Sequence, residues 1–526
     1  MTINSCDPAV IARRALAGIS APNGLPDAGS LAKLANRIFA ESSDHNPVPG
    51  KIPDASGVAL AAPAGFIPQG LPKIPAHDIG HHVATSSLLD ETSFYFLREL
   101  TVQGGPEPES IVKPAHSAFD VHAVRKDFPI LQERVKGYPL GWLDNAATTQ
   151  KPQAVIDRLA AFYRHENSNI HRAAHELAAR ATDAYEKARE AVARFLNAST
   201  ADEIVFVRGT TEAINLVAQS WGRQHIGKGD EMVISWLEHH ANIVPWQQLA
   251  TEKGAVLRVI PVDDSGQIIL EEYQKLLGEK TKLVSFTHVS NALGTVTPAK
   301  EMIEMANRVG ARVLLDGAQS VSHIQVDVQS LNPDWFVFSG HKIFGPTGIG
   351  VVYGKGDLLA ETPPWQGGGN MIKDVTFEKT EYQAPPAKFE AGTGNIADAV
   401  GLGAALAYVS KIGMSNISRY EHELLEYGTQ SLLSVPGLRL IGTAANKASV
   451  LSFVMPGKST EEIGTYLNQY GLAVRAGHHC AQPILRRFGL ESTVRPSLAF
   501  YNTHEEIDRL TSALKQLTLN SRTSSL

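Results

Sequence analysis

The sequence has only two cysteines, Cys6 and Cys480, in 526 residues. They lie far apart in the chain and no secretory signal precedes Cys6, so a structural disulfide is not expected. No apolar run approaches the length needed to cross a membrane. The formal net charge of -6 argues against a nucleic acid partner. We therefore expect a cytoplasmic protein that binds neither membranes nor nucleic acids.

The second cysteine has unusual neighbours. Cys480 lies in the run Arg475–Pro483, directly after His478 and His479. Imidazoles or a nearby arginine can lower the pKa of a thiol and so raise its fraction of thiolate, the nucleophilic form. A lone cysteine is more often a buried, inert side chain, but the neighbours here are polar. The pattern predicts a free, reactive thiol at Cys480.

Three apolar runs that read as buried strands end in polar residues. Trp335–Phe338 is followed by Ser339–Lys342, Arg312–Leu315 is followed by Asp316–Gln319, and Ile204–Val207 is followed by Arg208–Thr211. Open α/β sheets bind ligands at the carboxyl ends of their strands. There, Lys342 could form a Schiff base with an aldehyde and Asp316 could pair with a pyridinium nitrogen. Glycine, hydroxyls and a helix start after the third strand suit a phosphate. Together they predict a site for pyridoxal 5'-phosphate (PLP).

From about Ala118 to Leu517 the chain resembles the SufS-like, or group II, cysteine desulfurases, a family of fold type I PLP enzymes. The resemblance rests on Leu143–Ala147, Arg208–Glu212, Glu238–Trp246, Asp316–Gln319, Ser339–Lys342, the Cys480 loop and Val494–Ser497. It implies an aminotransferase-like α/β fold and a transferase reaction that converts L-cysteine to L-alanine.

The resemblance also assigns residues to the cofactor. Lys342 would bind PLP covalently and shuttle protons, Asp316 would pair with the ring nitrogen, and Gln319 would reach the ring hydroxyl. His239 would stack on the face of the ring and take part in catalysis. The remaining contacts to PLP would come from Thr210, Thr211, Ser339, His341, Asn291 and, from the other subunit of a homodimer, Thr393. The family usually has proline after that threonine, whereas this chain has Gly394.

Substrate contacts follow from the same comparison. Arg495 matches the arginine that binds the substrate carboxylate, for which a planar guanidinium is well suited. Asn291, His171 and Arg475 are expected to line the same pocket. The substrate would lose its α-proton and pass its sulfur to the thiolate of Cys480, which would become a persulfide. Because the persulfide must reach an acceptor thiol, we expect a mobile, exposed loop.

No metal site is expected. His239 and His240 are adjacent, and neighbouring side chains on an extended segment point to opposite faces, so they cannot easily bind one ion. A second group, His77, Asp78, His81 and His82, lacks cysteine or a wider set of ligands.

The strands alternate with helical patterns, which favours a mainly parallel sheet covered by helices. Further predicted strands are Val233–Ser235, Leu257–Ile260 and Leu283–Phe286. The pattern changes near Gly401, where Ala- and Leu-rich helices precede a short strand at Ser449–Phe453. We expect a largely disordered extension over residues 1–116, a PLP-binding large domain over 117–400 that begins with part of the small domain, and a small α/β domain over 401–526 with the Cys480 loop.

The extension is rich in proline and has few sustained apolar patterns. Its apolar segments are Leu31–Phe39, Phe66–Pro75 and Ser87–Leu100. It is similar to the extensions of cysteine desulfurases that are cargo of family 2 encapsulins, in which such a segment directs loading into the shell. The alternative is that these segments dock on the enzyme itself. Acidic residues and prolines argue against a mitochondrial presequence.

Several functions remain open at this point. The leading one is a desulfurase inside an encapsulin nanocompartment, for sulfur storage or mobilisation. The second is the same enzyme in the cytoplasm, supplying iron–sulfur cluster assembly through a sulfur-acceptor protein. Selenocysteine lyase and kynureninase share the architecture, but the Cys480 loop favours sulfur or selenium chemistry over carbon–carbon cleavage. An interaction protein on an inactive PLP fold is disfavoured, because Lys342, Asp316 and Cys480 are all present.

Overall fold

The computed structural model of the chain describes residues 119–171 and 174–523. All of these residues belong to one compact unit, Glu91–Leu526. The predicted extension, residues 1–116, lies outside the described residues, and so do its apolar segments, its histidine group and its cysteine.

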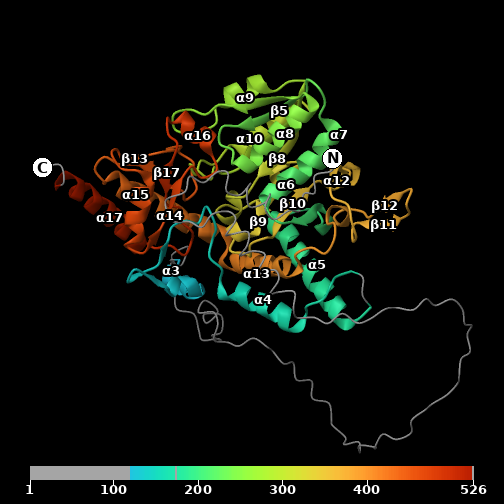
Figure 1. Cartoon of the computed structure of the whole chain (residues 1–526), viewed down its shortest axis with the longest axis horizontal. Helices are drawn as coiled ribbons and strands as arrows, with labels where there is room; N and C mark the ends of the chain where they lie inside the picture. The colour runs from blue at the N-terminus through green and yellow to red at the C-terminus, as the bar shows by residue number, and fades with distance from the viewer. Residues whose placement is uncertain (1–118, 172–173, 524–526) are drawn as a thin grey trace, which may run out of the picture. The chain divides into compact units, whose positions relative to one another are not determined.

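A seven-stranded sheet forms the centre of the described fold (Figure 1). Its strand order is β4-β10-β9-β8-β7-β5-β6, and only β10 is antiparallel to its neighbours. The strands are β4 Ile204–Val207, β5 Glu231–Ser235, β6 Val256–Ile260, β7 Thr281–Thr287, β8 Arg312–Asp316, β9 Trp335–Ser339 and β10 Gly350–Gly354. The predicted mainly parallel sheet is confirmed. A mainly parallel sheet covered by helices is the arrangement that the resemblance implied.

The central strands are buried along most of their length because helices cover both faces of the sheet. In β9, which is fully buried, Phe336 and Phe338 join one core cluster, whereas Trp335 and Val337 join the other. Successive side chains of a strand point to opposite faces, so a strand between two helix layers needs apolar residues at every position. This is why the strands could be recognised as continuous runs.

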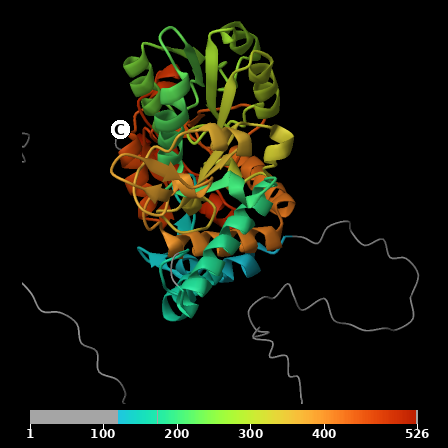
Figure 2. The same ribbon diagram turned by 90° about the vertical axis from the view of Figure 1, so that its right-hand side faces the viewer.

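Helices α4, α5 and α13 lie together on one side of the sheet, while α6 and α8 pack on the other (Figures 1 and 2). The helices of this part are α4 Gln153–His165, α5 Glu176–Leu196, α6 Thr210–Val217, α8 Val244–Lys253, α9 Leu270–Leu276, α10 Ala299–Arg308, α12 Gly356–Glu361 and α13 Ile396–Ile412. Capping residues determine where these helices begin and end. The His175 side chain accepts a hydrogen bond from Ala178 N at the start of α5, and Asn197 ends that helix in the left-handed conformation.

The C-terminal part contains a four-stranded antiparallel sheet of order β13-β14-β17-β16. Its elements are β13 Arg439–Leu440, β14 Phe453–Val454, β16 Arg475–Gly477, β17 Thr493–Arg495, α14 Met414–Leu433, α15 Thr460–Asn468, α16 Gln482–Arg487 and α17 His504–Thr523. A segment from early in the chain joins this part, since β3, Gly141–Trp142, pairs in parallel with β15, Leu472–Ala473.

Helix α13 runs through the boundary that we expected after residue 400, and it ends only at Ile412. Gly401 lies inside this helix, where a Cβ atom would come within 2.6 Å of Pro346 Cγ. The glycine therefore permits close packing and does not end an element. The helix that follows, α14, starts after Gly413, whose φ of +91° favours glycine.

The predicted strand at Ser449–Phe453 forms only at its last residue, where β14 begins. The preceding residues pair with the segment that follows β17, in the register that β14 and β17 share: Val450 forms an isolated antiparallel bridge with Ser497, and Leu498 N donates to Ser449 O. Ala448 N donates to Gly294 O, and Leu451 N donates to Pro496 O. The predicted strand is therefore present as antiparallel pairing, although only Phe453 lies within the bounds of β14.

A hairpin of β11, Ile372–Val375, and β12, Thr380–Tyr382, projects from the sheet (Figure 1). Within the described ranges, no single helix is both long and apolar enough to span a membrane; α13 and α14 meet that criterion only as a pair, which is bent by 75°.

Candidate active site

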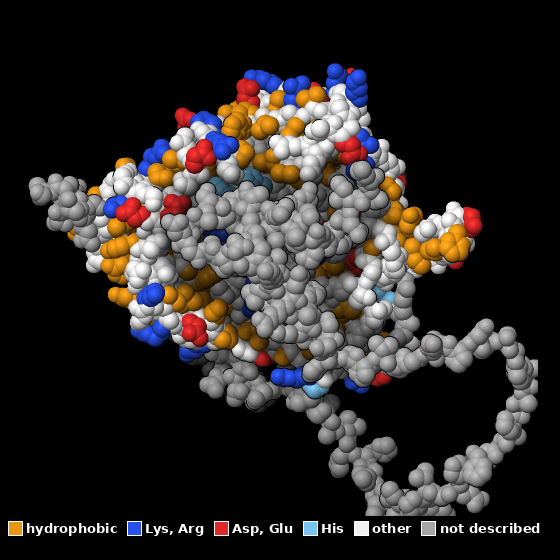
Figure 3. Space-filling view, viewed as in Figure 1, with side chains coloured by type: hydrophobic (Ala, Val, Ile, Leu, Met, Phe, Trp, Pro, Cys, Tyr) orange, Lys and Arg blue, Asp and Glu red, His pale blue; other side chains and the backbone are white. Residues whose placement is uncertain are grey.

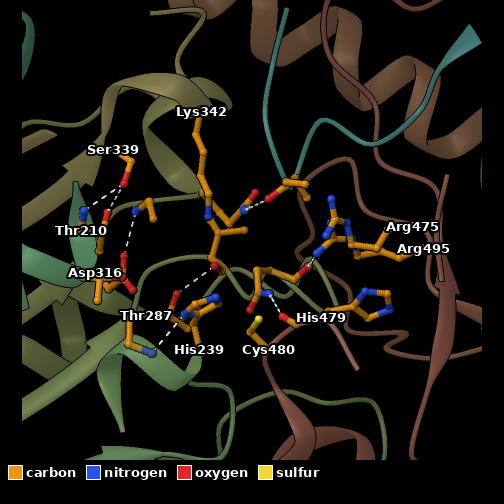
Figure 4. A pocket seen from close by; sticks show the side chains of 18 of the residues that line it. Thr210, His239, Thr287, Asp316, Ser339, Lys342, Arg475, His479, Cys480 and Arg495 are labelled. Carbon is orange, nitrogen blue, oxygen red and sulfur yellow. Dashed lines mark hydrogen bonds between the residues drawn. The ribbon is translucent and has the colours of Figure 1, made fainter. Parts of the chain in front are cut away.

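A cavity of about 480 Å³ opens at the carboxyl ends of the central strands (Figure 4). All but two of the residues predicted for the site line it, namely Thr210, Thr211, His239, Asn291, Asp316, Gln319, Ser339, His341, Lys342, Arg475, Cys480 and Arg495. They come from segments that follow five strands of the central sheet and from the C-terminal sheet. The cavity therefore lies between the seven-stranded sheet and the four-stranded C-terminal sheet, at the edge where open α/β sheets bind ligands.

Lys342 and Asp316 provide an amine and an acid in this cavity. Lys342 ends the 3₁₀ turn that follows β9, and burial lowers the pKa of its amine to about 8, while Asp316 and Cys480 raise it. Asp316 ends β8 and is buried. Burial raises the pKa of this carboxyl, while a 2.9 Å hydrogen bond from Ala318 N and the charge of Lys342 lower it. An amine with a lowered pKa is a better nucleophile near neutral pH.

The start of α6 forms a polar cradle at one end of the cavity. Thr210 N donates to Ser339 Oγ at 2.9 Å, and the two hydroxyls are also 2.9 Å apart. Thr211 and His341 line the same end. Free backbone N–H groups and hydroxyls at a helix start favour an anion. Burial lowers the pKa of His341 to about 4, so its imidazole is neutral at pH 7.

Cys480 lies at the opposite end of the cavity, and it is an exposed, free thiol (Figure 4). The loop is held on both sides of the thiol. Cys480 N donates to His478 Nδ1 at 3.0 Å, Cys480 O accepts from His240 N at 2.8 Å, and Asn291 Nδ2 donates to His479 O at 2.7 Å. Both His479 and Cys480 have φ of +53°, a conformation that is uncommon for these residue types and recurs at functional sites.

His239 extends into the cavity from the segment after β5 (Figure 4). Burial lowers the pKa of its imidazole to about 3, with further contributions from Lys342, His240 and Arg495. Its Nδ1 accepts a hydrogen bond from Ala241 N at 3.1 Å, so the neutral ring carries its proton on Nε2.

Arg495 and Arg475 lie side by side at the cavity wall (Figure 4). Arg495 is buried, and its Nη1 donates to Asn291 O at 2.8 Å. Burial lowers its pKa to about 10, so it remains charged at pH 7. Both guanidinium groups contact Asp144. Asp144 lies in the Leu143–Ala147 motif, but the sequence alone indicated no role for it.

Two predicted residues do not line this cavity in a single chain. His171 bonds through Nε2 to Glu186 Oε1 at 2.9 Å, and it precedes α5, on the helix layer below the sheet. Thr393 lines two other cavities, with Glu390 in one and Asn370 in the other. Thr393 was expected from the other subunit, so its place in a single chain does not test that prediction, whereas His171 was expected to line the pocket and does not line it in the single chain.

The family model described as aminotransferase class-V matches residues 141–510. The chain belongs to the aminotransferase class-V family. A cysteine desulfurase of Synechococcus elongatus is 60% identical, and the match covers 96% of this chain and 87% of that protein. A cysteine desulfurase of Escherichia coli O8 is 51% identical over 76% of this chain and 98% of its own length.

Among solved structures, the apo form of a cysteine desulfurase from Thermococcus onnurineus NA1 has a TM-score of 0.72 and 37% identity. The match covers 75% of this chain and 97% of that one. From this family, these relatives and this fold, the chain is a PLP-dependent cysteine desulfurase.

The residues of the cavity fit PLP. The cofactor needs an amine for its aldehyde, an acid for its ring nitrogen and an anion cradle for its phosphate. Lys342 and Asp316 supply the first two, and the start of α6 supplies the third. At the cradle, a Cβ atom on Gly209 would lie 3.1 Å from Ser339 Oγ, so a bare backbone keeps that position open.

Some lining residues were not singled out from the sequence, among them Thr287, Val289 and Ala146. Thr287 ends β7, so the strand-end rule that found Asp316 would also have found it. Among residues 119–171 and 174–523, no three histidine, cysteine, aspartate or glutamate side chains gather as metal ligands would.

Proposed function

We propose that Cys480 receives the sulfur of L-cysteine as a persulfide while the remainder of the substrate leaves as L-alanine. The thiolate of Cys480 attacks the substrate sulfur, so that an S–S bond forms as the C–S bond breaks. The electron pair of the broken bond stays on carbon, which then takes up a proton. The observation that carries this proposal is the free, exposed thiol of Cys480 at the wall of the cavity that also contains Lys342.

The cofactor would be held by residues already described. Lys342 would bind it covalently, Asp316 would keep its ring nitrogen protonated, and His239 would lie against its face. Further contacts would come from Gln319, Asn291, Thr210, Thr211, Ser339 and His341. When bound, PLP would stabilise negative charge at the substrate α-carbon.

Lys342 is also the proposed proton carrier. As a free amine with a pKa of about 8, Lys342 could accept the substrate α-proton and return a proton to the product near neutral pH. Arg495 is the proposed ligand of the substrate carboxylate, with Arg475 and Asn291 beside it, because a guanidinium binds a carboxylate through two parallel hydrogen bonds.

We propose a homodimer in which Thr393 contacts the phosphate of the PLP that the partner subunit binds. Two features support it. The cradle opens to the surface at a second cavity lined by Thr211 and Trp365. On the neighbouring β11–β12 hairpin, Val375 is 55% exposed and Phe377 is fully exposed, and Figure 3 shows hydrophobic side chains on the projecting hairpin. Exposed apolar patches of this kind mark interaction sites.

We further propose that the enzyme belongs to the SufS-like group and is cargo of an encapsulin nanocompartment, loaded through residues 1–116. The Synechococcus relative matches nearly all of this chain, whereas the Escherichia coli relative matches 76% of this chain along 98% of its own length. This difference in length supports a role outside catalysis, such as targeting, for the residues beyond the shared region. A sulfur-acceptor protein for iron–sulfur cluster assembly is the second candidate destination, favoured by the exposure of Cys480.

The persulfide can be trapped directly. Protein incubated with L-cysteine is alkylated and analysed by peptide mass spectrometry, and we expect a mass increase of one sulfur on the Cys480 peptide. Cys480→Ser should retain the absorbance of bound cofactor but accumulate no persulfide, and Lys342→Ala should lose alanine formation. Cys6→Ser is the matched control and should behave as the natural protein. Recovery of the extra sulfur on Cys6 would show that the wrong thiol was assigned.

A further inference from the structure

Two arginines stand directly opposite each other at the cavity wall. In the antiparallel pair β16–β17 the Cα partners are Arg475 and Arg495, so both side chains project from the same face of the sheet. Like charges at opposite positions destabilise a sheet. A carboxylate or another anion is needed to hold this pair together, and the structure contains one.

The carboxylate of Asp144 lies between the two guanidinium groups. Asp144 Oδ1 accepts from Arg495 Nη2 at 3.1 Å and from Arg475 Nε at 3.2 Å. Asp144 Oδ2 accepts from Arg475 Nε at 3.1 Å and Nη2 at 2.9 Å. Asp144 is buried, and it follows β3, the early strand that joins the C-terminal part.

Asp144 contacts the arginines from behind, because both arginines line the cavity and Asp144 does not. The side chain of Arg475 is 49% exposed and that of Arg495 is 2% exposed. Arg495 Nε is buried and has no hydrogen-bond partner among the described residues. Nη1 and Nη2 of Arg495 make one hydrogen bond each, to Asn291 O and to Asp144, and each carries a second N–H that can donate to a ligand.

We propose that Asp144 is a positioning and specificity-determining residue, which neutralises one of the two arginine charges and leaves the pair matched to a single substrate carboxylate. This inference deepens the proposed function, since it rests on Arg495 as the ligand of the substrate carboxylate. Two arginines and one aspartate leave one positive charge at the wall. The carboxylate of a ligand with one carboxyl group then neutralises this remaining positive charge, whereas a dicarboxylic ligand leaves an excess negative charge.

The proposal predicts a gain of binding, which a merely structural role would not give. Asp144→Asn leaves two positive charges at the cavity wall, so a dicarboxylate should bind better relative to a monocarboxylate of similar length. We expect the ratio of succinate to butyrate affinity to rise by about tenfold, which corresponds to about 1.4 kcal/mol. Asp144→Glu restores the charge and should keep the ratio within about threefold of the natural enzyme.

The experiment measures dissociation constants of succinate and butyrate for the PLP-loaded enzyme by calorimetry, at low ionic strength. Adding Arg475→Gln to Asp144→Asn removes the second charge and should return the ratio to its original value. Asp334→Asn is the matched control, because Asp334 also bridges two cations, Arg312 at 2.9 Å and Lys355 at 3.5 Å, but it lies away from the cavity.

An unchanged ratio in Asp144→Asn, or an equal rise in Asp334→Asn, would overturn the proposal. Cofactor absorbance and melting temperature are recorded for each variant, and the double variant decides the question if Asp144→Asn alone is destabilised. Because ligand binding needs no turnover, failure of Cys480 as sulfur acceptor would leave the affinity ratios unaffected. The two hypotheses therefore fail separately.

Discussion

At the scale of single residues, the chemistry depends on how burial shifts the pKa values of ionisable side chains. Lys342 is an ordinary lysine in sequence, and its surroundings make it reactive. Burial disfavours the ammonium form and lowers its pKa to about 8, although the carboxylate of Asp316 acts in the opposite direction. At pH 8 about half of such an amine is neutral, whereas an unperturbed lysine with a pKa of about 10.4 is almost entirely protonated.

This shift predicts how cofactor uptake depends on pH. Only the neutral amine can add to an aldehyde, so the rate at which apoenzyme takes up PLP should rise with pH through a midpoint near 8 and level off above it. Stopped-flow absorbance measures the rate. Asp316→Asn removes the charge that raises the pKa of Lys342 and should move the midpoint to lower pH. A midpoint near that of a solvated lysine in the natural protein would contradict the assignment.

Site residues could be predicted from sequence where chemistry follows a strand end. Asp316 comes directly after a run of buried apolar residues, Lys342 and Thr210 come a few residues after such runs, and parallel strands bring these positions together. The charge balance around Asp144 could not be predicted, because its partners Arg475 and Arg495 are 331 and 351 residues away in the sequence. Only the packing of β3 on the C-terminal part creates that contact.

At the scale of elements, β10 is the strand that lets the sheet approach the phosphate cradle. It is antiparallel to both neighbours and places Gly350 opposite Ser339 and Val207. A Cβ atom on Gly350 would lie 2.4 Å from the Cα of Gly209, a backbone atom that cannot rotate away. The close contact fixes the residue that precedes the start of α6.

Gly350→Ala should therefore weaken both folding and cofactor binding. Overpacking of this kind costs about 1–3 kcal/mol, and the displaced cradle should raise the dissociation constant of PLP. Urea unfolding and equilibrium dialysis measure the two effects. Gly278→Ala is the control, since nothing lies within 4 Å of the added atom, and it should change neither quantity. Equal behaviour of the two variants would show that the close approach is unimportant.

The elements that sequence patterns predicted best are those with the most buried surroundings. Strands such as β5, β7 and β9 lie between two helix layers and read as continuous apolar runs. The two-residue strands β3 and β15 carry no such pattern, because their pairing is set by tertiary packing and not by local composition. The role of Gly401 in close helix packing is likewise set by tertiary structure, so it cannot be recognised in a single sequence.

At the scale of the whole molecule, the proposed homodimer depends on the β11–β12 hairpin. Phe377 at its tip is fully exposed in the single chain, which is unusual for a large aromatic side chain without a partner. Phe377→Asp should raise the dimer dissociation constant by at least about tenfold, or about 1.4 kcal/mol. Sedimentation equilibrium measures it. Glu378→Ala on the same turn is the control, and equal dissociation of both variants would argue against an interface there.

The extension and the catalytic region are expected to work independently of each other. The Escherichia coli relative is matched along 98% of its own length by 76% of this chain, so a protein of that shorter length is sufficient for a cysteine desulfurase. Deleting residues 1–116 should therefore leave alanine production per subunit within about twofold of the full chain, a change of under about 0.5 kcal/mol in the barrier.

The same deletion should abolish co-purification with an encapsulin shell protein when the two are co-expressed, and residues 1–116 fused to an unrelated soluble protein should carry that protein into the shell. Electron microscopy and gel analysis of purified shells measure both results. Because the fusion contains no desulfurase, it separates targeting from catalysis. Loading of the truncated enzyme would place the shell contact on the catalytic unit, whereas loss of most turnover would mean that the extension docks on the enzyme and supports its fold; either result would contradict a targeting role.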